Sequence, residues 1–312
     1  MGSIIGPIEK DEGYDPNFSA AANIATAPTG LLIPPSNVMI TFSLVSGGTS
    51  VAALFMAGYI PGALWALACM LVVYIYAKKA GYRSQTKLTG KEKFNAFIQA
   101  LPCLLLIIIV IGGIIAGVFT ATEGSVVAVV YSLLLSIYGY KSMKWKDLPE
   151  IFRSSAEMTG IIIFLIGVSS IMSWVMAFTN IPTMVSNGLL SISSNKYVIL
   201  LMINIILLVV GTFMDMTPAT LIFTPIFLPV CTALGMNTIH FGIMLIFNLC
   251  IGTITPPVGT TLFVGVKVGG VKIETVFKHL LPYFFAIIVV LMLVTYIPQL
   301  SLWLPGLMGY VS

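Results

Sequence analysis

The chain has 312 residues, of which 58% are hydrophobic and 8% are charged, and its formal net charge is +4. A soluble globular domain carries about 25% charged residues, so this composition cannot cover a water-facing surface. The basic residues form no continuous basic face, which excludes nucleic acid as a partner. The composition therefore predicts an all-α polytopic membrane protein surrounded by the lipid bilayer.

Apolar stretches long enough to cross a bilayer recur along the chain. Two of them, 18–45 and 240–266, are interrupted by Gly and Pro pairs, and 197–234 carries an aspartate and a proline near its centre. A shorter apolar stretch, 181–193, is expected to form a helix on the outer surface, with 147–157 as its cytoplasmic counterpart. Uninterrupted spans are predicted at 51–77, 96–118, 123–140, 156–178 and 276–299.

Lysine and arginine cluster beside these spans, and basic loops favour the cytoplasm. The loops 78–93, 141–153 and 267–278 are therefore placed in the cytoplasm, and the C-terminus on the opposite side. Both ends of 197–234 then lie outside, so this stretch is predicted to be a re-entrant hairpin with its turn near 211–217. Non-helical backbone at membrane depth is tolerated only where it is buried in protein or lines a cavity.

A constant offset in residue number aligns the two interrupted stretches. The matched positions are Gly30 with Gly252, Pro34–Pro35 with Pro256–Pro257, and Gly47–Gly48 with Gly269–Gly270. The first stretch is predicted to run outward and the second inward, so the two copies are inverted. Inverted repeats with broken helices are typical of secondary transporters that bind their substrate near the membrane midplane.

Each interrupted stretch is predicted to be a broken helix. Carbonyls and hydroxyls at a break can bind a hard cation such as Na⁺, and half-helix N-termini favour an anionic group. The alternative is a proline kink whose polar groups are satisfied by neighbouring helices. The hydroxyl and amide side chains at the two breaks are Thr26, Thr29, Ser36 and Asn37, and Thr253, Thr255, Thr260 and Thr261.

Two acidic residues lie inside or beside apolar stretches. Asp215, in the predicted hairpin turn, could bind a cation, or it could shape the turn by accepting backbone N–H groups. Glu123 has capping-box spacing with Thr120, and capping is preferred to ion coupling as its role.

Three classes of function follow: a cation-coupled secondary transporter, an intramembrane enzyme, and a channel or non-transporting scaffold subunit. An aspartyl protease needs two facing acids, and Asp215 is the only aspartate deep in an apolar stretch. No nucleophile–base pair and no Walker motif appears in the sequence. The transporter is preferred, because a scaffold has no evident need for inverted broken helices. No enzymatic activity and no cofactor are expected.

Several motifs carry a resemblance to a known family. They are AAANIATAPTGLLIPPSNVMI (20–40), ALFMAGYIPG (53–62), GVFTATEGSVVAVVYSLLL (117–135), GTFMDMTPATLIFTPIFLPV (211–230) and HFGIMLIFNLCIGTITPPVG (240–259). The chain resembles the large membrane subunit of tripartite ATP-independent periplasmic (TRAP) transporters. The sequence PPSN followed by VMITFSLVSGG is most similar to the sialic-acid members.

The resemblance implies an elevator-type Na⁺ symporter in the bacterial inner membrane, with a periplasmic C-terminus. A periplasmic binding protein would deliver an organic anion, usually a carboxylate, and a small membrane subunit, separate or fused, would brace the scaffold. Relative to the family, the N-terminal part with the first hairpin tip is expected to be missing. Residues 2–15 would be the returning arm of that hairpin, matched by the repeat to 224–237.

The resemblance also implies a division of the chain. Residues 1–50, with the returning arm and first broken helix, and 196–270, with the second hairpin and second broken helix, would form the transport domain. Residues 51–195 would be scaffold and arm helices, and 271–312 a C-terminal scaffold helix. The implied Na⁺ ligands are Asp215, Thr217, Gly252 and Thr255. The full candidate set for ion and substrate is Thr26, Thr29, Gly30, Pro34, Ser36, Asn37, Gly211, Asp215, Thr217, Gly252, Thr253, Thr255, Pro256, Gly259 and Thr260.

Overall fold

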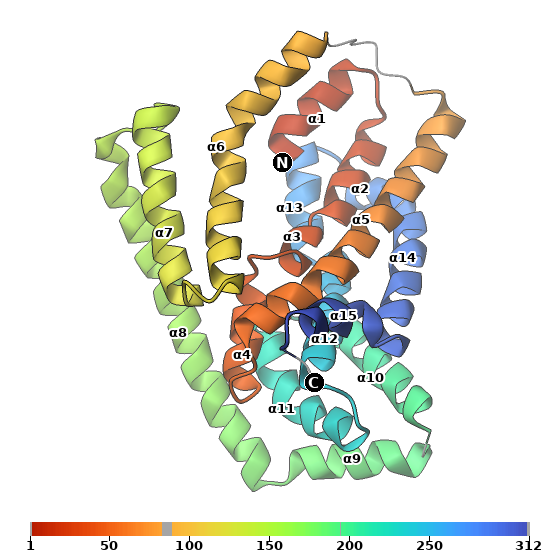
Figure 1. Cartoon of the computed structure of the whole chain (residues 1–312). Helices are drawn as coiled ribbons and strands as arrows, with labels where there is room; N and C mark the ends of the chain where they lie inside the picture. Colours follow the sequence, from red (N-terminus) through yellow and green to blue (C-terminus); the bar gives the residue numbers. More distant parts are fainter. Residues whose placement is uncertain (1, 83–88, 194, 311–312) are drawn as a thin grey trace. The chain divides into compact units, whose positions relative to one another are not determined.

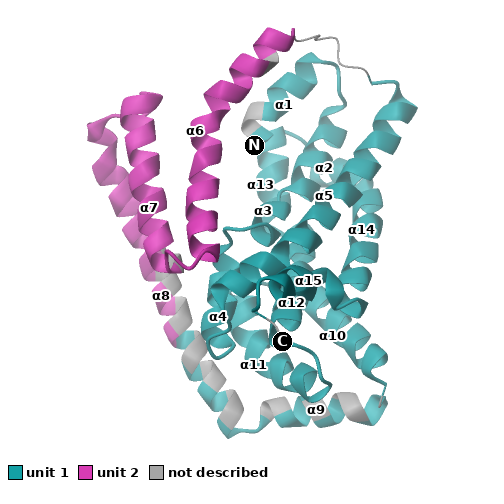
Figure 2. Cartoon of the chain, viewed as in Figure 1, with its two compact units in different colours: residues 1–84, 168–312 teal, residues 85–167 magenta. Residues whose placement is uncertain are grey.

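Helices make up the regular structure of the protein. The computed structural model describes residues 2–82, 89–193 and 195–310, and every regular element within these ranges is helical. Two compact units are formed, one by residues 1–84 with 168–312 and one by residues 85–167 (Figure 2). Within the described residues, five helices are long and apolar enough to cross a membrane, or six if one bent pair is a single span. The predicted all-α membrane fold is confirmed.

The uninterrupted spans lie where the apolar stretches predict them. They correspond to α5 (Val51–Ala80), α6 (Gly90–Ile115), α7 (Ala121–Leu134) with its π-helical continuation η1 (Leu135–Gly139), α8 (Leu148–Phe178) and α14 (Ile273–Tyr296). Of these, α5, α6, the helix over Thr122–Gly139 and α14 are among the five that are long and apolar enough to cross, and the fifth is Met216–Ala233. At the start of α7, the Thr120 N–H donates to Glu123 Oε2 at 2.8 Å, and the Glu123 N–H donates to Thr120 Oγ1 at 3.2 Å. The predicted capping box is therefore confirmed.

One predicted surface helix is wrong. Segment 147–157 is not a separate cytoplasmic helix, because α8 runs without a break through 31 residues. Its only proline, Pro149, lies in the first turn, where proline costs no helical hydrogen bond. Arg153 and Glu157, one turn apart, pair at 3.0 Å along the continuous helix. The other short helix does form, as α9 (Ile181–Ile192) after α8.

Both interrupted stretches are broken helices. The first consists of α2 (Pro16–Thr26), α3 (Thr29–Leu32) and α4 (Asn37–Val45), and the segments Pro16–Leu32 and Asn37–Val45 are bent by 46°. The second consists of α12 (Thr238–Thr253) and α13 (Thr260–Gly269). Pro34–Pro35 lies between α3 and α4 and Pro256–Pro257 lies between α12 and α13, so the aligned prolines occupy equivalent places in the two breaks. Both Pro–Pro bonds are cis.

The predicted hairpin is also present. α10 (Lys196–Gly211) and α11 (Met216–Ala233) are joined by a turn at 212–215. α11 returns to pack against α9, the helix that precedes α10 (Figure 1). α9 contacts both α10 and α11, so one helix lies beside both arms of the hairpin.

The internal repeat extends to the helix boundaries. The offset that relates Gly30 to Gly252 also aligns helix ends. The end of α1 (Gly2–Asp11) matches the end of α11. The start of α2 matches the start of α12, and the start of α5 matches the start of α14. In the unit that contains both breaks, α2 packs beside α13, whereas α4 packs with α11 and α12 (Figure 1). The two copies therefore run in opposite directions, as predicted. At their meeting point Cys250 Sγ lies 3.9 Å from the carbonyl oxygen of Pro28, its own repeat counterpart.

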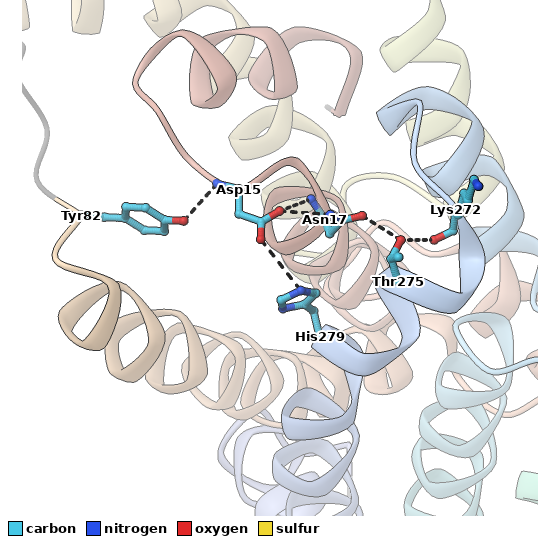
Figure 3. Close-up of polar contacts among 6 residues, drawn as sticks. All are labelled: Asp15, Asn17, Tyr82, Lys272, Thr275 and His279. Atoms are coloured by element: carbon cyan, nitrogen blue, oxygen red, sulfur yellow. Dashed lines mark hydrogen bonds and ion pairs between the residues drawn. The ribbon is translucent and has the colours of Figure 1, made fainter.

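Polar contacts anchor the start of α2 (Figure 3). Asp15 caps the helix by accepting the Asn17 N–H at 2.8 Å, and the Asp15 N–H donates to the Tyr82 hydroxyl at 3.0 Å. From α14, the Thr275 hydroxyl donates to Asn17 Oδ1 at 2.8 Å, and His279 Nε2 lies 4.0 Å from Asp15 Oδ2. The half-helix that leads to the first break is thus tied at its N-terminal end to α14 and to the residues that follow α5.

α15 (Gln299–Leu307), which packs against α5, was not predicted as a separate helix. Arg83 and Lys87 of the first basic loop lie outside the described residues. The division into transport and scaffold segments stays a prediction, because packing within compact units does not report which segments move.

Candidate functional site

The end of α10 touches the end of α12 through two glycines. A Cβ atom on Gly252 would lie 2.3 Å from the Gly211 oxygen, 2.4 Å from its carbonyl carbon and 2.6 Å from its Cα. No side chain fits at this distance, so glycine is required for the two backbones to meet. Small residues at helix crossings are the usual means of close packing between membrane helices. The hairpin tip is thereby held against the second break.

Two further contacts connect the tip to this break. The Val258 N–H donates to the Thr212 carbonyl oxygen at 3.1 Å, and the Thr260 hydroxyl reaches Asp215 Oδ1 at 3.5 Å. The first is an ordinary hydrogen bond, and the second is at the outer limit for one. Candidate residues from positions 211–217 and 252–260 are therefore adjacent in space.

Asp215 is the acidic group of this region. It occupies the N-cap position of α11 with an extended backbone, but its side chain accepts no capping hydrogen bond. The exposed carboxylate is instead turned toward Thr260. Thr260 is the first residue of α13, so the N-terminal ends of α11 and α13 both lie beside this carboxylate. Helix N-termini carry partial positive charge and attract negatively charged groups.

The other second-break residues bond mainly within their own segment. The hydroxyls of Thr253 and Thr255 donate to the carbonyls of Cys250 and Ile251 at 2.8 and 2.6 Å. A hydroxyl that donates its hydrogen still has oxygen lone pairs that can face a cation. Gly259 has room for no side chain, since its Cβ would lie 2.6 Å from the Thr255 oxygen.

Two candidates at this break stand apart from the contacts just described. Pro256 forms the cis bond within the break. Thr217, half-buried in the first turn of α11, makes no hydrogen bond to the second break among the described residues.

The first break presents its polar groups differently. The Thr26 hydroxyl donates to the Ala22 carbonyl at 2.8 Å, and the Thr29 hydroxyl donates to the Thr26 carbonyl at 2.6 Å. Ser36 is 2% exposed, and within the described part of the chain its hydroxyl has no hydrogen-bond partner. Pro34, which forms the cis bond with Pro35, is buried, and Asn37 is exposed at the start of α4.

A cavity of about 1330 Å³ connects the two breaks. Its walls are α1, α2, α3 and α13, and it brings Thr26, Thr29 and Gly30 of the first break to Thr260 of the second. The buried hydroxyl of Ser19, which has no partner among the described residues, lies in the same wall. Asp215 and Gly211 are not part of the lining. Thr260 is therefore the candidate residue shared by the cavity and the tip contact.

This arrangement suits two kinds of ligand. A carboxylate, hydroxyls and backbone carbonyls are the donors that a hard alkali cation prefers. Helix N-termini and a hydroxyl-lined cavity suit an anionic organic molecule. Both sets of groups meet at Thr260.

Sequence reasoning missed a buried polar group outside the breaks. Asn204 on α10 and Asn248 on α12 are fully buried and hydrogen-bond to each other, and Asn204 also hydrogen-bonds to Thr295 on α14. The available signal was a single amide inside each of the apolar runs YVILLMINIILL and IMLIFNLCI. Polar side chains inside membrane helices commonly connect helices.

Comparisons with known proteins agree with this architecture. The model of the family described as "Tripartite ATP-independent periplasmic transporter, DctM component" matches residues 1–300. The chain is 52% identical to the protein YgiK of Salmonella typhimurium, over 98% of this chain and 70% of YgiK. It is 36% identical to the sialic acid TRAP transporter large permease protein SiaM of Vibrio cholerae, over 96% of this chain and 70% of SiaM. It is 34% identical to the C4-dicarboxylate TRAP transporter large permease protein DctM of Rhodobacter capsulatus, over 99% of this chain and 73% of that protein.

Proposed function

The chain belongs to the DctM family of tripartite ATP-independent periplasmic transporters, and on that premise we propose that it couples the import of a carboxylate to Na⁺. Membership makes it a multi-pass inner-membrane component of a secondary transporter that depends on a substrate-binding protein. It is therefore not an enzyme. Its partners are a small permease subunit and a periplasmic binding protein.

The observation that carries the Na⁺ proposal is the meeting of the hairpin tip with the second break. Asp215 supplies a negative charge, and its carboxylate is turned to Thr260 instead of capping its own helix. The Gly211–Gly252 contact keeps the backbone oxygens of both segments close by. We therefore assign the coupling ion to Asp215, Thr217, Gly252 and Thr255.

A carboxylate is proposed as the substrate because the relatives named above are a sialic acid permease and a C4-dicarboxylate permease. Both named substrates are organic acids. The cavity between the breaks is lined by the hydroxyls of Thr26, Thr29 and Thr260. Each of them now donates to an acceptor within the protein, and rotation of the O–H would redirect that hydrogen bond to the carboxylate. Sialic acid is the first compound to test, and C4-dicarboxylates are the second.

Uptake by the complete transporter tests the proposal. The chain is purified with its small subunit, reconstituted in liposomes, and supplied with the cognate binding protein and radiolabelled sialic acid or succinate. We expect accumulation only with an inward Na⁺ gradient and only with the binding protein. Equal uptake when K⁺ replaces Na⁺ would refute the coupling. Accumulation of neither acid, by a complex that binds its delivery protein, would refute the substrate class.

The orientation is proposed from the basic loops. Residues 78–93, 141–153 and 267–278 are assigned to the cytoplasm and the C-terminus to the periplasm. In intact spheroplasts, the cysteine of Lys146→Cys should not react with a membrane-impermeant maleimide, whereas the cysteine of Ser312→Cys should react. The reverse pattern would invert the assignment.

The moving part is proposed to be the pair of segments 1–50 and 196–270, which carry both breaks and the hairpin. Their contacts across the repeat, such as Cys250 with Pro28, support movement as one body.

A further inference from the structure

Three helices are connected by a buried polar network away from the breaks. Asn248 Nδ2 donates to Asn204 Oδ1 at 2.6 Å, and Asn204 Nδ2 lies 3.2 Å from Thr295 Oγ1. Asn204 and Asn248 also donate to the carbonyls of Leu200 and Met244 in their own helices, at 2.9 and 2.8 Å. Both amides are 0% exposed, and Thr295 is 1% exposed. One residue before Thr295, the Val294 carbonyl lies 2.8 Å from His240 Nε2 on α12.

This network is costly to bury. Moving an amide from water into an apolar core costs free energy unless the amide is fully hydrogen-bonded there. Asn248 Oδ1 has no partner among the described residues, so one acceptor remains unsatisfied. Leucine has the same branched arrangement of heavy atoms as asparagine, so leucine at both positions would keep the shape of the pair without that cost. Packing alone does not explain why polar residues occupy this place.

The internal repeat shows that the packing of α12 on α14 does not require Asn248 and Thr295. The repeat counterpart of Asn248 is Thr26, whose hydroxyl bonds within its own helix. The counterpart of Thr295 is Val73. The pair α2 and α5 nevertheless packs together as α12 and α14 do. This helix pair is therefore built once with Asn248 and Thr295 and once with Thr26 and Val73, without a polar contact between helices at these two positions in the second case.

The position of the network relative to the hairpin tip suggests its purpose. Asn248 lies four residues before Gly252, about one helical turn, and Asn204 lies seven residues before Gly211, about two turns. A slip of α10 along α12 would separate the two glycines. It would also move Thr212 away from Val258, to which it is hydrogen-bonded.

We propose that Asn204, Asn248 and Thr295 are positioning residues that fix the register of α10 on α12 and α14. They hold the hairpin tip against the second break without touching the ion or the substrate. This inference rests on the proposed function for its transport readout, because the geometry being held is that of the proposed Na⁺ site. Directional hydrogen bonds set register, whereas apolar side chains allow neighbouring helices to slide.

The transport test uses the complete transporter in liposomes. Asn204→Leu and Thr295→Val should raise the Na⁺ concentration for half-maximal uptake about five- to tenfold and leave the maximal rate within about twofold. Thr295→Ser, which keeps the hydroxyl, should behave as wild type. The matched control is Ile205→Leu on α10, whose side chain is 52% exposed. The double variant Asn204→Leu/Asn248→Leu should melt at or above the wild-type temperature and still require the higher Na⁺ concentration.

A second readout does not depend on transport. Thr212 is half-buried at the tip contact. Cysteine at this position, with the exposed Cys103 replaced by serine, should react slowly with a maleimide. Adding Asn204→Leu should accelerate the reaction several-fold, and adding Ile205→Leu should not.

The outcomes separate the inference from the proposed function. If the rate of wild-type uptake does not depend on the Na⁺ concentration, the proposed coupling is refuted. The maleimide labelling rate alone then tests the positioning role. If the Na⁺ requirement and the labelling rate are both unchanged in Asn204→Leu and Thr295→Val, the positioning role is overturned. It is equally overturned if Thr295→Ser or Ile205→Leu produces the same changes.

Discussion

Substitution of Gly252 by alanine should separate the hairpin from the broken helix. The new Cβ would lie 2.3 Å from the Gly211 oxygen, whereas ordinary contact begins at 3.4 Å, so the backbones must part by about 1.1 Å. All three of the nearest atoms belong to the Gly211 backbone, and a rotamer change cannot relieve the clash.

The free-energy change has three parts. Overpacking costs about 1–3 kcal/mol. Loss of the Thr212–Val258 hydrogen bond adds about 0.5–1.5 kcal/mol. The better helix propensity of alanine offsets about 0.5–1 kcal/mol, because Gly252 lies within α12. The net destabilisation is about 2 kcal/mol, or about thirtyfold in an equilibrium constant.

Gly30→Ala is the matched control. Gly30 is the repeat counterpart of Gly252, and nothing lies within 4 Å of a Cβ built on it. This change should be neutral or slightly stabilising for folding. Thermal unfolding of the purified transporter in detergent, with and without Na⁺, measures both variants. A melting temperature for Gly252→Ala equal to that of Gly30→Ala would contradict the close-contact reasoning.

Three further changes test other parts of the structure. Asp215→Asn should raise the Na⁺ concentration for half-maximal uptake at least about tenfold with little effect on melting, because the exposed carboxylate caps no helix; an unchanged Na⁺ dependence would reduce Asp215 to a turn residue. Trp65→Phe should lower the unfolding free energy by about 1–3 kcal/mol, since the buried indole donates to the Ala25 carbonyl at 2.8 Å; chemical denaturation measures this, and an unaltered midpoint would show that the carbonyl finds another donor. Glu123→Ala should cost about 1 kcal/mol and Glu123→Gln less, because glutamine also completes a capping box with Thr120; equal losses, or lost Na⁺ dependence at normal stability, would point to a role beyond capping.

Local features of the fold follow from the sequence. The spans are predictable because bilayer thickness sets the length of an apolar helix, as α5 and α14 show. The breaks are predictable because Pro34–Pro35 and Pro256–Pro257 cannot continue a helix. The prediction of a separate helix at 147–157 is wrong because no helix breaker follows Pro149 until Gly160, so this polar segment continues directly into the apolar span.

Contacts between distant segments are harder to predict from the sequence. The sequence names Gly211 and Gly252 as candidates, but only the folded chain shows that their backbones touch. Asn204 and Asn248 lie 44 residues apart, and neither carries a motif. Their pairing depends on the rotation of α10 about its axis, which a nearly uniform apolar surface does not specify.

The contact between Cys250 and Pro28 marks the pseudo-two-fold axis that relates the two repeats. In a dimer of two identical antiparallel halves, a residue on the two-fold axis would touch its own copy, which is an isologous interface. Cys250 and Pro28 occupy such equivalent positions and meet in the same way. Both halves belong to one polypeptide, so a substitution at one of the two positions leaves the other unchanged and has to fit only that residue.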